Sequence, residues 1–84
     1  MNNQKRMAII EAIGWYGPVA LILAYALVSF GVVGAESYAF QLLNLTGAIA
    51  IIVISAAKKV YQSVALNIFW SIIAIVALVR LLIA

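Results

Sequence analysis

Residues 55–70, SAAKKVYQSVALNIFW, place two adjacent lysines, Lys58 and Lys59, between two long apolar runs. Charged side chains are costly inside a lipid bilayer, so such a pair marks the junction between two membrane spans. The same stretch carries Asn67 deep inside the second run, where leucine would be the safer residue. It therefore predicts two membrane helices joined by a short basic turn, with a polar side chain inside one of them.

The composition of the whole chain supports a membrane protein. Hydrophobic residues make up 69% of the 84 residues and charged residues 8%, against about 45–50% and about 25% in soluble domains. A small soluble fold has too high a surface-to-volume ratio to hide this much apolar surface. Lipid is expected to cover most of it.

Three apolar runs are each long enough to span a bilayer, which takes about 20 residues. We expect an all-α integral membrane three-helix bundle, with 1–84 as a single membrane domain. The predicted helices are residues 12–33, 38–57 and 60–82. Ser37 is a plausible N-cap for the second helix, and Pro18 predicts a kink or an irregular first turn in the first. Residues 1–11 are expected to form a short amphipathic segment along the membrane surface.

The beginning of the chain also fits a second pattern. Lys5 and Arg6, the apolar run after them and the small residues at 33–35 resemble a secretory signal peptide. The long first run favours a retained membrane helix.

Orientation follows from the basic residues that flank the spans. Lys5 and Arg6 precede the first helix, and Lys58 and Lys59 lie between the second and third. All four are expected on the cytoplasmic side near lipid headgroups. The N-terminus is then cytoplasmic and the C-terminus outside, in a bacterial inner membrane. Arg80 does not fit this rule, but it can extend its charge to headgroups near the chain end.

Each helix carries polar or small residues at the spacing of three to four that defines one helical face. Tyr25, Asn44 and Ser71 are each expected about 18–21 Å from the cytoplasmic end, in one layer. Ser29 and Gln41 are expected slightly further in, and Asn67 about one and a half turns nearer the cytoplasm. The candidate packing or pocket-lining residues are Tyr25, Ser29, Gln41, Asn44, Ser63, Asn67 and Ser71.

Two roles fit these polar side chains. Amides and hydroxyls commonly form hydrogen bonds between membrane helices, each contributing about 0.6–2 kcal/mol. Alternatively, Asn44 and Asn67 face a cavity and contact a polar ligand. Both roles predict asparagines that point inward, so the alternatives remain open at this stage.

The sequence lacks the residue types that usually support catalysis, metal binding or cofactor binding. The chain has no cysteine and no histidine, and its serines have no neighbouring base to activate them. Glu11 and Glu36 belong near opposite membrane faces. We expect no enzyme activity, no metal, no cofactor and no nucleic-acid partner. If the chain bound a pigment or a haem, only a side-chain amide or a backbone carbonyl could ligate the metal.

The segments IGWYGPVALILAYALVS, YAFQLLNLTGAIAIIVIS and KKVYQSVALNIFW resemble a group of small, uncharacterised three-helix bacterial membrane proteins. The resemblance covers almost the whole chain. QLLNLTGA and LNIFW are its most specific parts. It implies a fold but no activity.

More distantly, the order of features resembles the SemiSWEET half-transporters, which dimerise around a sugar-sized pocket. Gly47 and Asn67 would match a glycine and a pocket-lining asparagine of that family. Leu27 and Val28 occupy the position of its Pro-Gln motif, and Ile51 that of its pocket tryptophan. The family is also drawn with its N-terminus outside, opposite to the orientation expected here.

Two functions therefore remain as hypotheses. The first is a non-enzymatic accessory or structural subunit that acts through helix–helix contacts, either in a larger membrane complex, for example a respiratory or photosynthetic one, or in a homo-oligomer. The alternative is a SemiSWEET-like half-transporter, in which two copies enclose a pocket for a small polar solute. Membrane lipids are partners under both.

Overall fold

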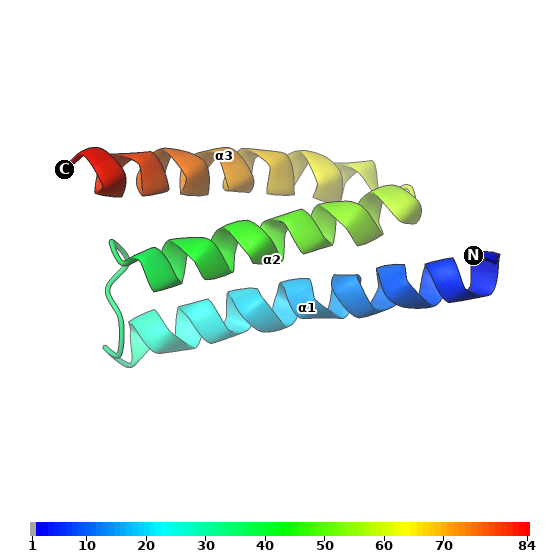
Figure 1. The fold of residues 1–84 in the computed structure, drawn as a ribbon, viewed down its shortest axis with the longest axis horizontal. Helices are drawn as coiled ribbons and strands as arrows, with labels where there is room; N and C mark the ends of the chain where they lie inside the picture. The colour runs from blue at the N-terminus through cyan, green and yellow to red at the C-terminus, as the bar shows by residue number, and fades with distance from the viewer. Residues whose placement is uncertain (1) are drawn as a thin grey trace.

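The computed structural model describes residues 2–84 and contains three helices in an antiparallel arrangement (Figure 1). They are α1, Asn3–Ser29; α2, Tyr38–Ala57; and α3, Tyr61–Ile83. No strand occurs within residues 2–84. All three helices are long and apolar enough to cross a membrane, so the predicted all-α, three-helix membrane architecture is confirmed.

Helix α1 differs from its predicted bounds at both ends. It begins at Asn3, so no break separates the expected surface segment from the spanning helix, and it is continuous through Pro18. The helix can start this early because the side chain of Asn2 accepts a hydrogen bond of 2.8 Å from the Lys5 backbone N–H. Of the expected 1–11 segment, residue 1 lies outside the described residues.

The other end of α1 is set by Gly31, which has a positive φ of 74°. The Gly31 N–H donates to the Val28 carbonyl and the Val32 N–H to the Leu27 carbonyl. This pair of bonds is a Schellman motif, which satisfies the last carbonyls of a helix and turns the chain away from it. Helix α1 therefore stops four residues before the expected residue 33.

Helix α2 begins at the N-cap that the sequence predicts, because the Ser37 hydroxyl accepts from the Phe40 backbone N–H. It ends in a second Schellman motif, in which Val60 N–H donates to the Ser55 carbonyl at 2.8 Å. The residue with positive φ is here Lys59, at 60°. The left-handed conformation costs about 1–2 kcal/mol for a residue with a β-carbon. Lys59 therefore allows a tight α2–α3 turn but lowers the stability of the protein.

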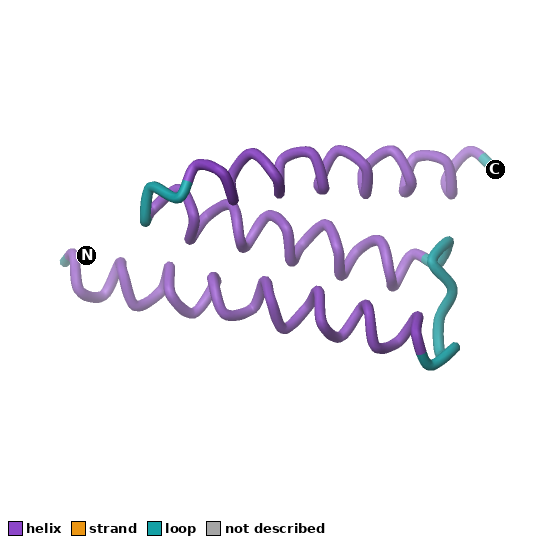
Figure 2. Tube along the Cα trace, turned by 180° about the vertical axis from the view of Figure 1, so that it is seen from behind, coloured by secondary structure: helices purple, strands orange, loops and turns teal. Residues whose placement is uncertain are grey.

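Helix α2 lies between the other two, as Figures 1 and 2 both show. It packs against α1 and against α3, and within residues 2–84 no Cα of α1 lies within 8 Å of a Cα of α3. The N-terminus and the α2–α3 turn lie at one end of the molecule, the N-terminal end. The C-terminus and the α1–α2 connection lie at the other, the C-terminal end. The first turns of α1 extend beyond the α2–α3 turn (Figure 1).

The helix contacts are built from small residues, and no large side chain among residues 2–84 is fully buried. Because lipid is as apolar as a leucine side chain, membrane helices gain from close backbone approach more than from burying large apolar groups. The buried residues are Gly14, Gly17, Ala20 and Ala24 in α1; Asn44, Gly47, Ala48, Ala50 and Ser55 in α2; and Asn67, Ser71 and Ala74 in α3.

Candidate functional site

Asn44 and Trp70 join α2 to α3 near the middle of the molecule. The Trp70 indole N–H donates to Asn44 Oδ1 at 3.2 Å, and Asn44 Nδ2 donates to the Phe40 carbonyl at 2.8 Å. Asn44 is 7% exposed, so both halves of its amide are satisfied away from lipid. An amide bonded on both sides is typical of a packing contact.

A second polar contact joins the same helices near the α2–α3 turn. Ser55 Oγ donates to Ser63 Oγ at 2.8 Å. Asn67 Nδ2 donates to the Ser63 carbonyl, one turn earlier in α3, at 2.9 Å. Asn67 is buried, but within residues 2–84 its Oδ1 receives no hydrogen bond from a side chain or the backbone. The amide therefore keeps one free acceptor.

Ser71 completes the polar side of α3, but its hydroxyl has no partner. Its Oγ is buried and makes no hydrogen bond within the described chain. A buried hydroxyl without a partner costs about 1–3 kcal/mol relative to a satisfied one. Ser71 thus lies where the sequence predicts, on the inner side of α3, without contributing a hydrogen bond there.

The predicted polar face of α1 is not the face that packs. Pro18, Tyr25 and Ser29 are exposed, with Tyr25 at 75%. The buried face of α1 is instead formed by its glycines and alanines, because only residues with little or no side chain allow α1 and α2 to come this close. A β-carbon added at Gly17 would lie 2.8 Å from the Gly47 carbonyl oxygen.

One polar contact between α1 and α2 was missed from the sequence. The hydroxyls of Tyr16 and Thr46 are 2.7 Å apart. Thr46 Oγ1 donates to the Leu42 carbonyl at 2.8 Å, so Tyr16 is the donor to Thr46. The available sign that this side of α1 packs was the run of small residues at intervals of three to four, namely Gly14, Gly17, Ala20 and Ala24.

The four basic residues of the N-terminal end have different surroundings. Lys58 Nζ lies 2.6 Å from Glu11 Oε1, an ion pair between the α2–α3 turn and α1. Both side chains are about half exposed to solvent, so the pair contributes about 0–1 kcal/mol. Lys5 and Arg6 are exposed and belong to the first two turns of α1, before Glu11. Lys59 is the residue with positive φ that ends α2.

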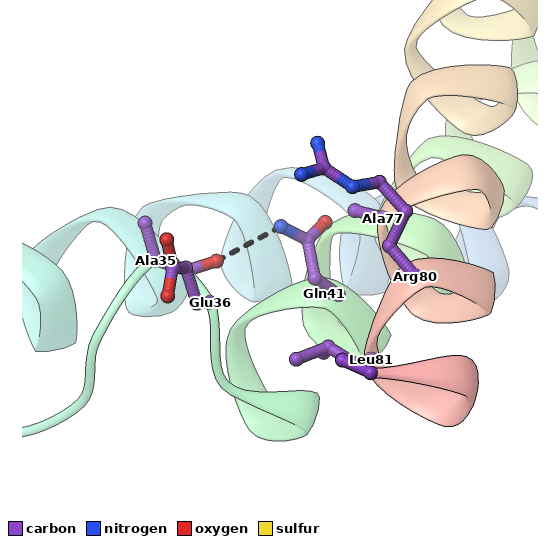
Figure 3. Close-up of a pocket in the computed structure, with 7 residues that line it drawn as sticks. Ala35, Glu36, Gln41, Ala77, Arg80 and Leu81 are labelled. Carbon is purple, nitrogen blue, oxygen red and sulfur yellow. Dashed lines mark hydrogen bonds between the residues drawn. The ribbon is translucent and has the colours of Figure 1, made fainter.

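Gln41 belongs to a pocket at the C-terminal end (Figure 3). Its Nε2 donates to the Ala35 carbonyl at 2.9 Å, tying α2 to the connection before it. The pocket has a volume of about 220 Å³, and its charged side chains are those of Arg80 and Glu36. Its lining residues, which we call the C-terminal pocket, are Ala35, Glu36, Gln41, Ala77, Arg80, Leu81 and Ala84.

Two apolar grooves continue from this pocket toward the middle of the molecule. The first, of about 260 Å³, lies between α2 and α3 and is lined by Phe40, Gln41, Asn44, Trp70, Ile73 and Ala74. The second, of about 350 Å³, also reaches α1 and is lined by Leu21, Ile22, Tyr25, Phe40, Asn44 and Trp70. Gln41 joins the pocket to the first groove, and three residues are common to the two grooves. Asn67 lines none of these three spaces.

The chemistry available to this arrangement is binding by hydrogen bonds, by two opposite charges and by apolar contact. Among residues 2–84 there is no cluster of histidine, cysteine, aspartate or glutamate that would hold a metal ion. Asn44, Ser55, Ser63, Asn67 and Ser71 all lie on the α2–α3 side, whereas Tyr25 and Ser29 do not join them.

No curated protein and no solved structure matches the chain. A family model without an assigned function matches residues 10–84, which is most of α1 together with all of α2 and α3. The match does not extend to the SemiSWEET half-transporters. With this coverage, the chain belongs to an uncharacterised protein family whose model includes residues of all three helices.

Proposed function

We propose that this protein is a small, non-enzymatic membrane subunit that acts through helix–helix contacts. Its partner is a larger membrane complex, such as a respiratory or photosynthetic one, or a further copy of itself. One observation carries the proposal: the polar side chains inside α2 and α3 are bonded mainly to the chain's own helices, and the exceptions are one free acceptor at Asn67 and the buried hydroxyl of Ser71. An arrangement of this kind favours packing over the binding of a polar solute.

The proposed location is a bacterial inner membrane, with the N-terminus cytoplasmic and the C-terminus outside. The support is the distribution of charge between the two ends of the molecule. Lys5, Arg6, Lys58 and Lys59 all belong to the N-terminal end, against Arg80 at the C-terminal end. An excess of lysine and arginine is characteristic of cytoplasmic loops.

The experiment that tests the proposed function is native mass spectrometry after gentle extraction from the source membrane, with wild type and two matched variants. Asn67→Leu removes the amide whose Oδ1 is free, and Asn44→Leu removes one whose Oδ1 is held by Trp70. We expect wild type in a stable complex, which Asn67→Leu weakens. We expect Asn44→Leu to retain the complex while loosening α2 from α3.

The outcomes separate the alternatives. Larger subunits in the wild-type complex identify an accessory subunit, and a homodimer identifies a homo-oligomer. A homodimer that survives Asn67→Leu but loses uptake of a small polar solute would support the half-transporter instead. A wild-type monomer under every gentle extraction condition would rule out the proposal.

A further inference from the structure

The C-terminal pocket holds two opposite charges that do not neutralise each other. Arg80 and Glu36 both line it, yet no ion pair joins them, and the one ion pair within residues 2–84 is at the opposite end. In the view of Figure 3 the Gln41 amide lies between them. With Gln41 Nε2 donating to the Ala35 carbonyl, the pocket presents a cation, an anion and an amide oxygen to any occupant.

In a bilayer we expect the pocket at the depth of the lipid headgroups. It is formed by the last two turns of α3, the start of α2 and the connection that precedes α2. Because the ends of spanning helices reach the headgroup region, a headgroup can enter it from the membrane surface. The occupant that matches separate positive and negative charges is itself zwitterionic.

The pocket and the apolar grooves together reach about the depth of one lipid leaflet. From Arg80 in the pocket to Trp70 in the grooves is ten residues of α3, about 15 Å. That distance is half of the roughly 30 Å hydrocarbon core. Apart from Gln41 and Asn44, the groove linings are alanine, leucine, isoleucine and aromatic residues. Their shape and chemistry suit one acyl chain lying beneath the headgroup.

We propose that this end of the protein binds one phosphatidylethanolamine molecule. The lipid phosphate accepts hydrogen bonds from the Arg80 guanidinium, and the ammonium donates to the Glu36 carboxylate. One acyl chain follows the groove between α2 and α3 toward Trp70. Phosphatidylglycerol would bring its negative charge to Glu36 without an ammonium to balance it. Phosphatidylcholine has no N–H group to donate.

Lipid titration followed by native mass spectrometry tests the headgroup assignment. The full chain is purified in a delipidating detergent and offered the three lipids with identical acyl chains. We expect one phosphatidylethanolamine to bind most tightly, and Arg80→Gln to weaken it about tenfold through loss of charge-assisted bonds. Arg80→Lys should restore most of the affinity. Glu36→Gln should abolish the preference over phosphatidylglycerol. Lys5→Gln, which removes a cation at the other end, should change nothing.

Quenching of Trp70 fluorescence tests where the acyl chain lies. The chain has two tryptophans, so Trp15→Phe leaves Trp70 as the single reporter. In bilayers of brominated phosphatidylcholine, added unlabelled phosphatidylethanolamine should relieve the quenching more than added unlabelled phosphatidylcholine. Arg80→Gln should remove this difference. Glycerophosphoethanolamine, which has no acyl chain, should give no relief.

Several results would overturn the inference. Equal binding of the three lipids to wild type, or unchanged binding in Arg80→Gln, would mean that the two charges recognise no headgroup. Relief by glycerophosphoethanolamine would mean that the pocket takes a soluble phosphate compound and that the grooves bind no lipid chain. None of these results depends on whether the chain assembles with a partner, so they are separate from the test of the proposed function.

Discussion

The two helix contacts of this protein are built in different ways. Helices α1 and α2 meet through glycine and alanine, and a β-carbon added at Gly17 or Gly47 would lie 2.8 or 3.0 Å from the carbonyl oxygen of the other glycine. Helices α2 and α3 meet through buried amides and hydroxyls, joined by the Trp70–Asn44 and Ser55–Ser63 hydrogen bonds. The first contact is mainly steric, with one exposed hydrogen bond between Tyr16 and Thr46, and the second is polar.

The difference shows two solutions to one problem. In lipid, apolar side chains gain little by leaving their surroundings for another helix, so close packing and hydrogen bonds must hold helices together. Close packing requires small residues at the contact, and it is disrupted when a larger side chain is introduced. Hydrogen bonding needs particular side chains and fails when one is removed. The two contacts should therefore respond to opposite kinds of substitution.

Adding one methyl group to the steric contact has the largest expected effect. In Gly17→Ala the new β-carbon would lie 2.6 Å from Ile51 Cγ1 and 2.8 Å from the Gly47 oxygen. We expect the free energy of unfolding to fall by about 1–3 kcal/mol, because α1 must move away from α2. The measurement is SDS unfolding in mixed micelles, followed by thiol labelling of a cysteine introduced at buried Ala48; the chain has no other cysteine.

Gly34→Ala is the matched control, because its β-carbon would meet no atom closer than 3.9 Å. We expect it to unfold as wild type does. Equal stability of Gly17→Ala and Gly34→Ala would show that α1 and α2 are not in backbone contact.

Removing one hydrogen bond from the polar contact has the next largest effect. Trp70→Phe removes the indole N–H that donates to Asn44 Oδ1. In a double-mutant cycle with Asn44→Leu we expect a coupling free energy of about 0.6–2 kcal/mol. The same unfolding assay measures it. As a control, the cycle is repeated with Trp70→Phe and Gly17→Ala, whose effects on the free energy of unfolding should add. A coupling free energy between these two substitutions would mean that the α1–α2 and α2–α3 contacts are not independent.

The smallest effect compares two serines of the polar contact. Ser55→Ala removes a bonded hydroxyl and should cost about 0.5–1.5 kcal/mol, whereas Ser71→Ala removes a buried hydroxyl without a partner and should be neutral or stabilising. Unfolding free energies of the two variants give the comparison directly. A loss of stability in Ser71→Ala as large as that in Ser55→Ala would show that Ser71 has a hydrogen-bond partner in the membrane.

Much of the architecture could be predicted from local sequence. The three spans follow from run length and composition, and the start of α2 follows from Ser37. The inner positions of Asn44, Asn67 and Ser71 follow from their spacing along one helical face. These predictions succeed because lipid excludes polar groups from the outside of a helix, and the sequence records that exclusion directly.

The position of α1 could not be predicted in this way. Tyr25 and Ser29 are polar enough to indicate an inward face, but Gly14, Gly17, Ala20 and Ala24 are the residues that pack. Small residues allow close backbone approach, but they are a weaker sign of the inward face than polar residues, because lipid does not exclude them. The face of α1 that packs inward depends on whether the neighbouring helix has a small residue at the matching position. Gly47 of α2 is such a residue for Gly17, and it lies 30 residues further along the chain.

The sequence by itself determined that this chain forms three membrane-length helices and which polar residues of α2 and α3 avoid lipid, because both follow from the transfer of single residues between water and hydrocarbon. Only the tertiary structure decided that α2 lies between the other two helices. It also decided that Asn44 is bonded to Trp70 and that Arg80 and Glu36 share one pocket without pairing. Those outcomes depend on which helix surfaces fit together when the backbones approach closely. This is a property of a pair of helices and cannot be read from either helix alone.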